Sequence, residues 1–246
     1  MIRLFVPILA GATLRDRALA CVGGVVGILV TSTLSWMLLH DLATLPLLVA
    51  PMGASAVLVF AVPASPLAQP WPVIGGNMVS ALVGVGMFHL VPNIHIAAGL
   101  AVGAAILAMS LLRCLHPPGG AAALTAVIGG PVVTAAGWLF PFAPVAINAG
   151  LLVLAGVAYH RLSGHSYPHR AVPVFGNELA ERGLAAPHPE DISAALNDLG
   201  ETFDISSGDL ELLIRRVDYY AAQRRSPPVR RISPEEQRRG VRTERV

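Results

Sequence analysis

The sequence has very little charge, and almost all of it lies near the two ends. Of the 246 residues 13% are charged, whereas an average soluble domain has about 25%. Arg113 is the only formally charged residue between Asp41 and Arg161. No acid occurs between Asp41 and Glu178. This composition excludes an ordinary soluble domain and predicts an all-α, polytopic membrane protein with a polar tail.

Lysine is absent, so every basic side chain other than histidine is arginine. Together with the abundance of Ala, Gly and Pro, this bias is typical of a GC-rich bacterial genome. We therefore expect a protein of the bacterial inner membrane, with the lipid bilayer as its first partner. The first apolar run is long and has no small-residue cleavage site after it, which favours a retained span over a signal peptide.

Patterns typical of catalysis and of metal binding are also missing. The two cysteines, Cys21 and Cys114, lie in or beside apolar segments and have no zinc-ligand spacing. Cys114 and His116 are two residues apart and would face different sides of a helix. The sequence has no glycine-rich phosphate loop and no nucleophile–base–orienter set. We expect no enzyme activity, no metal or other cofactor and no nucleic-acid partner.

Long apolar runs dominate the rest of the chain. A bilayer core of about 30 Å requires about 20 apolar residues in a helix. Six segments qualify, at residues 18–39, 43–62, 73–91, 96–112, 117–139 and 144–159. Pro46 and Pro51 interrupt the second, and Gly129, Gly130 and Pro131 interrupt the fifth. We expect six spans, two of them broken; four full spans, with the second and fifth half-inserted, is the alternative.

The arginines predict the orientation. Arg3, Arg15 and Arg17 precede the first span, and Arg161 and Arg170 follow the sixth. By the positive-inside rule both termini are cytoplasmic, so the number of crossings is even. The predicted parts are a cytoplasmic N-terminus (1–17), a transmembrane domain (18–160), a linker (161–188), a helical cytoplasmic segment (189–225) and a disordered Arg-rich tail (226–246).

The cytoplasmic segment contains two predicted helices. Residues 189–200 have acids in the first turn and end at Gly200. Residues 206–225 have an amphipathic pattern, with acid at the start and arginine at the end, as a helix dipole favours. Residues 189–246 could therefore bind a cytoplasmic partner or anionic lipid.

The two halves of the transmembrane domain share a pattern. "PMGASAVL" (51–58) and "PPGGAAAL" (117–124) match in Pro, Gly, Ala and Leu, and each lies in the second span of its half. The third spans begin with "PVIGGN" and "PVAIN". Such broken segments at matching positions predict two inverted three-helix repeats. Small residues at Gly23/Gly27, Gly76/Ser80/Gly84 and Gly99/Gly103 predict close helix packing in lipid.

The breaks also predict a binding site. A helix that restarts within the membrane has free N–H groups and a positive dipole at its first turn, and such an end binds anions. No acid lies in spans two to six, where cation carriers usually keep a carboxylate. The candidate substrate-binding residues are Gly53, Ala54, Ser55, Gln69, Asn77, Arg113, His116, Gly119, Gly120 and Asn148.

Simpler explanations stay open for three of these features. Arg113 is also explained as a snorkelling anchor at the headgroups. His116 is also explained as a residue that hydrogen-bonds at a helix end. The Pro-Pro-Gly-Gly stretch is also explained as a tight turn without a ligand.

Three motifs resemble the HPP family of integral membrane proteins, named for His-Pro-Pro. They are "LHPPGGA" (115–121), "APMGASAVL" (50–58) and "SPLAQPWPVIGGN" (65–77). The family usually has His or another polar residue where Asn77 stands and Asn where Pro72 stands, so these two positions depart from its pattern. The resemblance implies a bacterial inner-membrane protein related to plastid-envelope and cyanobacterial members associated with nitrite transport, often described with four spans.

The resemblance also bears on the C-terminal segment. Many family members append tandem CBS domains, which sense adenine nucleotides. Residues 189–225 resemble the segment that precedes those domains, but no CBS domain follows them in this sequence.

The leading hypothesis is a transporter or channel for a small inorganic anion, with nitrite as the best candidate. One alternative is a membrane-anchored interaction or sensor module that acts through the tail. Another is a pore for a small neutral solute. The sequence leaves the oligomeric state open, including a homo-oligomer.

Overall fold

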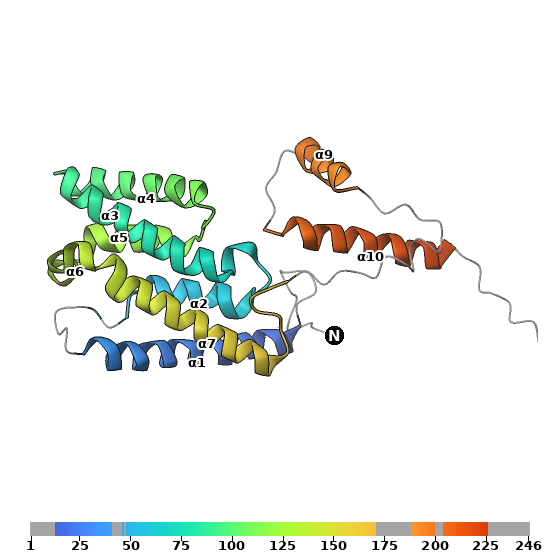
Figure 1. The fold of residues 1–246 in the computed structure, drawn as a ribbon, viewed down its shortest axis with the longest axis horizontal. Coiled ribbons are helices and arrows are strands. Elements are labelled where there is room, and N and C mark those ends of the chain that lie inside the picture. The colour runs from blue at the N-terminus through green and yellow to red at the C-terminus, as the bar shows by residue number, and fades with distance from the viewer. Residues whose placement is uncertain (1–12, 41–45, 47, 171–187, 200–203, 226–246) are drawn as a thin grey trace, which may run out of the picture. The chain divides into compact units, whose positions relative to one another are not determined.

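The computed structural model describes residues 13–40, 46, 48–170, 188–199 and 204–225 (Figure 1). It has two compact units. The first, here called the membrane unit, comprises Met1–Arg170 and Asp204–Ser206, and the second comprises the other C-terminal residues. The predictions for residues 1–12 and 171–187 and for the disordered tail at 226–246 lie outside the described residues.

Four long apolar segments in the membrane unit can each cross a bilayer. They are α1 (Leu14–Leu39), α3 (Asn77–Leu90), α4 (Ile94–Leu111) and α7 (Ile147–Ser163), where α3 and α7 are counted with the π-helical turns η2 (Pro72–Gly76) and η4 (Pro141–Ala146) that precede them. All four agree closely with predicted spans, because long apolar runs between turn residues are the strongest signal in a membrane sequence.

The two broken spans are half-length helices. α2 (Pro51–Ala61) and α5 (Pro118–Ile128) each have 11 residues, or about 16 Å of helix, which is half of a bilayer core. α5 is followed by α6 (Pro131–Ala136) and the short η3 (Gly137–Leu139), and the chain bends by 91° at Gly129 and Gly130. The protein is therefore a polytopic helical membrane protein with four full-length spans, or five if the bent pair counts as one, and not six full ones.

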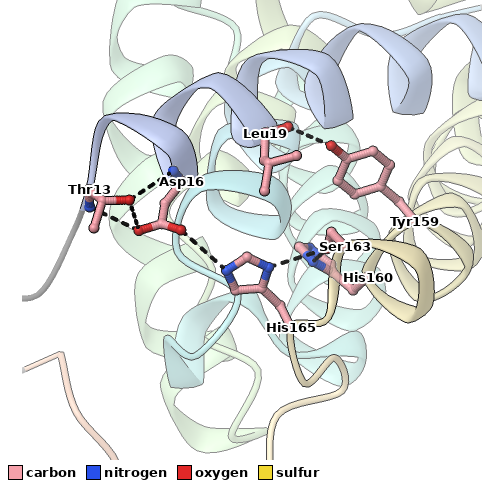
Figure 2. Close-up of polar contacts among 7 residues, drawn as sticks. All are labelled: Thr13, Asp16, Leu19, Tyr159, His160, Ser163 and His165. Carbon is pink, nitrogen blue, oxygen red and sulfur yellow. Dashed lines mark hydrogen bonds and ion pairs between the residues drawn. The ribbon is translucent and has the colours of Figure 1, made fainter.

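α1 and α7 lie side by side and run in opposite directions (Figure 1). The Tyr159 hydroxyl near the end of α7 donates to the Leu19 carbonyl near the start of α1, at 2.7 Å (Figure 2). At the other end of the pair, the Asn148 amide donates to the Ser35 hydroxyl, also at 2.7 Å. The start of α1 and the end of α7 therefore lie on the same side of the membrane unit.

The burial pattern supports the repeat but shifts its register. Helices α2 and α5 bury the same positions, namely Pro51, Met52, Ser55, Ala56, Val59 and Phe60 in α2 and Pro118, Gly119, Ala122, Ala123, Ala126 and Val127 in α5. Pro51 thus corresponds to Pro118 and not to Pro117, as the sequence pattern predicted. The physical reason is that Pro117 caps α5 and Pro118 is its first residue, the position where proline is best tolerated.

Small residues bring some helices into contact but not all. A Cβ at Gly23 would lie 2.6 Å from the Phe60 ring, and one at Gly84 would collide with the Ala123 backbone of α5. These glycines have the predicted packing role. At Gly99 and Gly103 an added Cβ would have no neighbouring atom within 4 Å among the described residues, so that prediction is wrong for them.

The second unit contains the two predicted tail helices, α9 (Pro189–Leu199) and α10 (Ser207–Arg225). On α10 the apolar side chains Leu213, Val217 and Tyr220 are exposed. The short segment before α10 belongs to the membrane unit, where the Ser65 hydroxyl donates to the Asp204 carboxylate at 2.8 Å.

Candidate functional site

A buried polar cluster joins the two halves of the membrane unit. It comprises Ser55 on α2, Asn77 at the start of α3 and His116 in the link before α5, and all three side chains are fully buried. The Ser55 Oγ lies 2.8 Å from the His116 Nε2 and 3.1 Å from the Asn77 Nδ2. We call these three residues the buried cluster.

The hydrogen bonds of the buried cluster have one consistent direction. The His116 Nδ1 lies 2.8 Å from the Leu67 carbonyl, which can only accept, so Nδ1 carries a proton. In a neutral ring the Nε2 is then an acceptor, and the Ser55 hydroxyl donates to it. The Ser55 oxygen in turn accepts from Asn77. The order of donation is Asn77 to Ser55 to His116 to Leu67.

Burial keeps the imidazole of this cluster neutral. His116 lies in the link between α4 and α5, outside the apolar helices that cross the membrane. Desolvation by the surrounding protein lowers the pKa of His116 to about 4, and the hydrogen bond to Leu67 opposes this only in part. In the same link, burial raises the pKa of the Cys114 thiol, so the thiol is neutral at pH 7.

Two buried polar atoms on α3 have no hydrogen-bond partner among the described residues. They are the Asn77 Oδ1 and the Ser80 Oγ, which lie three residues apart on one face of the helix. The Asn77 Nδ2, by contrast, donates to both Ser55 and the Val73 carbonyl. Buried polar atoms nearly always have partners, so a water or a ligand atom would satisfy these two on one face of α3.

Gly119 of α5 packs directly onto this face. A Cβ at position 119 would lie 2.6 Å from the Ser80 Oγ and 2.9 Å from the Gly76 carbonyl. Only glycine allows α5 to approach α3 so closely. Gly119 is thus brought to the polar face of α3, whereas Gly120 is half-buried beside Val102.

The first-turn amides of the half-length helices differ from the prediction. The Gly119 and Gly120 amides donate to the carbonyls of His116 and Pro117, at 2.8 and 3.1 Å. In α2 the Met52 and Gly53 amides donate to Val49 and Ala50 in the same way. The expectation of free amides there is wrong, because the prolines remove donors and the tight turns use those that are left.

Other predicted residues lie away from the buried cluster. Gly53 and Ala54 are on the exposed side of α2. Arg113 is exposed and ends α4 with a left-handed φ of 54°. Gln69 donates to the carbonyls of Pro63 and Ser65 and accepts from the His169 amide, and so shapes the loop at residues 63–69.

Asn148 forms a second tie between the halves. Its Oδ1 accepts from the Val49 amide at 3.0 Å, and its Nδ2 donates to Ser35. Val49 lies two residues before Pro51, and His116 lies two residues before Pro118. Asn148 of the second half therefore holds Val49 before α2 directly. Asn77 of the first half holds His116 before α5 through the Ser55 hydroxyl.

Sequence reasoning missed several members of this site. The sequence pattern indicates Ser80 only as a packing residue, although its position three residues after Asn77 was a usable signal. The Leu67 carbonyl gave no signal, since any residue supplies one. The Ser55–His116 pair was also missed, because these residues are 61 positions apart. Among the described residues, no group of three His, Cys, Asp or Glu side chains could hold a metal ion.

A further polar cluster holds the ends of α1 and α7 together (Figure 2). The Ser163 hydroxyl lies 3.3 Å from the His160 Nδ1 and 3.2 Å from the His165 Nδ1. The His165 Nε2 lies 4.0 Å from the Asp16 carboxylate, and the His160 Nε2 lies 2.8 Å from the Val59 carbonyl. These contacts tie α1, α2 and α7 at one end of the membrane unit.

Comparisons with known proteins agree with the architecture. The family model described as "HPP, transmembrane region" matches residues 10–168, which is more than half of the chain. A transmembrane protein of Dictyostelium discoideum is 37% identical over 147 residues, covering 58% of this chain and 51% of its own length. A second one from the same organism is 33% identical over 168 residues, covering 67% and 52%. This chain spans about half the length of these relatives, and no solved structure matches it.

Proposed function

Because the chain belongs to the HPP transmembrane family, we propose that it is a transporter or channel for a small inorganic anion, with nitrite as the best candidate. The observation that supports this most is the buried cluster with the two unpartnered atoms of Asn77 and Ser80 beside it. The proposed location is the bacterial inner membrane with both termini in the cytoplasm.

The chemistry of the buried cluster suits a small ion. Its side chains are hydroxyl, amide and imidazole, which donate hydrogen bonds to the oxygens of a small anion when their N–H and O–H groups are free. No carboxylate occurs between residues 41 and 178 to repel an anion or to hold a cation. The irregular backbone next to this cluster is the link that carries His116 and the loop that carries Leu67.

Purified protein in liposomes tests the proposal. Uptake of nitrite and nitrate, and the current that each carries, should exceed those of protein-free liposomes. Ser55→Ala should lower the flux at least tenfold, whereas Ser110→Ala, a matched change at an exposed serine of α4, should leave it unchanged. If neither ion moves faster than in empty liposomes, the protein is not a carrier of these anions.

A pore for a small neutral solute is the second candidate. The absence of a charged side chain in the buried cluster favours it. Osmotic swelling with small neutral solutes such as urea or glycerol measures this activity directly. Swelling without any anion flux would favour this candidate over the first.

An interaction or sensor function of the tail is a third candidate, supported by the exposed apolar side chains of α10. Removing residues 207–246 tests it and retains the hydrogen bond between Ser65 and Asp204. Flux that survives this truncation makes the tail accessory to transport. We propose transport rather than catalysis.

A further inference from the structure

The direction of the hydrogen bonds in the buried cluster depends on one proton. In the neutral state the Ser55 hydroxyl donates to the His116 Nε2, and the Asn77 Nδ2 donates to the Ser55 oxygen and the Val73 carbonyl. The free atom of Asn77 is its Oδ1, an acceptor. An anion needs donors, so the neutral cluster is poorly prepared for one.

We propose that His116 takes up one proton with each anion, so that the protein is a proton–anion symporter. This inference rests on the proposed function and names its coupling ion. The proton binds at the Nε2 of His116, because the Nδ1 already carries one and donates it to Leu67.

Protonation turns the buried cluster into an anion site. The Nε2–H then donates to the Ser55 oxygen, which can also keep the hydrogen bond from Asn77, since a hydroxyl oxygen accepts two. The Ser55 hydroxyl proton is thereby released and can be donated to an anion. The site gains a positive charge and a donor in one step, with the Ser80 hydroxyl one turn further along α3 as a second donor.

The proton and the anion therefore stabilise each other in the site. A buried imidazolium is costly when alone, and a neighbouring anion removes most of that cost. By linkage, a bound anion raises the affinity for the proton, and a bound proton raises the affinity for the anion by the same factor. The step is balanced, since the proton enters from water on one side and leaves with the anion on the other.

Within the helices packed around His116, no other titratable side chain lies close enough to take up the proton in its place. α2 and α5 have no titratable side chain, and those of α3 and α4, His89 and His95, lie near the opposite ends of these helices from the cluster. The other groups to consider are on the link itself or bind the loop that carries Leu67. They are Arg113, Cys114, Tyr167, His169 and Asp204.

The test follows the pH inside liposomes that contain the protein and a trapped pH-sensitive dye. The membrane potential is held at zero with potassium and valinomycin, and nitrate and nitrite are the probes. Nitrate is included because nitric acid is strong, so protein-free liposomes give little background. An inward anion gradient should acidify the lumen, and an inward proton gradient should drive anion accumulation.

The outcomes separate the two proposals. Anion flux without acidification, carried instead as current, would overturn the symport and leave anion transport standing. No anion flux would reject the proposed function itself.

Two histidine variants locate the coupling. His116→Asn keeps a donor for Leu67 but cannot be protonated, and accumulation driven by a proton gradient should fall at least tenfold. His95→Asn, the same change at an exposed histidine of α4, should keep it. Size-exclusion chromatography checks that each variant is folded. If His116→Asn does not fold, Ser55→Ala serves as the second variant with the same expected loss. Wild-type accumulation in a folded variant of either residue would overturn the inference.

Discussion

The Ser55 Oγ and the His116 Nε2 lie 2.8 Å apart although 61 residues separate them in the chain. Ser55 lies on the half-length helix of the first half, and His116 lies two residues before the half-length helix of the second half. Their hydrogen bond therefore joins the two repeats at the place where each repeat departs from a regular spanning helix. Separating the two repeats at this point would break this bond.

Ser55→Ala should reduce both stability and flux. The substitution leaves the His116 Nε2 and one Asn77 N–H without a partner, and a buried unpaired polar group costs about 1–3 kcal/mol. Thermal unfolding in detergent measures the first effect, and anion uptake into liposomes measures the second. Ser55→Cys retains a weaker donor, so its stability and its flux should lie between those of wild type and of Ser55→Ala. An alanine variant with wild-type flux would show that the hydroxyl has no role in transport.

The stability of the protein should depend on pH through His116. Its pKa of about 4 lies below the ordinary value of 6.5, so between these pH values the unfolded chain binds a proton that the folded chain does not. The free energy of unfolding should thus be complete above pH 6.5 and fall as the pH drops toward 4, by roughly 3 kcal/mol. Unfolding scans of wild type and His116→Asn across this range should show a shallower fall in the variant.

The same scans contain their own control. Every other titratable group is present in both proteins, so the difference between the two curves isolates His116. Parallel curves would mean that His116 has the same pKa in the folded and unfolded chain, which contradicts its burial.

Much of the fold could be predicted from the sequence, because hydropathy and helix-breaking residues act locally. The predicted helix at residues 206–225 differs from α10 by one residue, and "PMGASAVL" marked the half-length α2. The register of the repeat was off by one residue, since two adjacent prolines offer two possible helix starts and only packing selects Pro118. The membrane spans were thus easier to predict than the residue-by-residue alignment of the two repeats.

The site was less predictable, because its bonds join residues that are distant in sequence. Ser55, Asn77 and His116 stand out in the sequence by their polarity, and the structure brings these three together. Arg113 stands out by its charge, but its left-handed backbone ends α4 and its side chain is exposed. The amides of Gly119 and Gly120 were expected to be free, and local carbonyls use them.

Gly84→Ala should destabilise the membrane unit. The added methyl group would meet the Ala123 backbone and lie 2.7 Å from its neighbour Ala126, and overpacking of this kind costs about 1–3 kcal/mol. Gly99→Ala is the matched control, since it lies in a helix with no atoms within 4 Å of the new Cβ among the described residues. Thermal unfolding of the two variants should differ by several degrees, with Gly99→Ala at or above wild type because alanine favours helix.

Asn148→Ala should separate structure from transport. Asn148 accepts from the buried Val49 amide and donates to Ser35, so its loss leaves both groups unpaired and should lower stability by about 1–3 kcal/mol. These two hydrogen bonds hold α1 and the chain before α2, whereas the buried cluster is held by Ser55, Asn77 and His116. The proton-to-anion ratio should therefore stay at the wild-type value, even where less folded protein reduces total uptake.

Asn77→Ala is the matched change in the buried cluster. It removes a donor to Ser55 and should lower the flux per folded molecule at least tenfold. Measuring folded protein, anion uptake and lumen acidification on both asparagine variants decides the assignment. An Asn148→Ala variant with an altered proton-to-anion ratio would place Asn148 in the pathway, because a residue that only joins helices cannot change which ions move together.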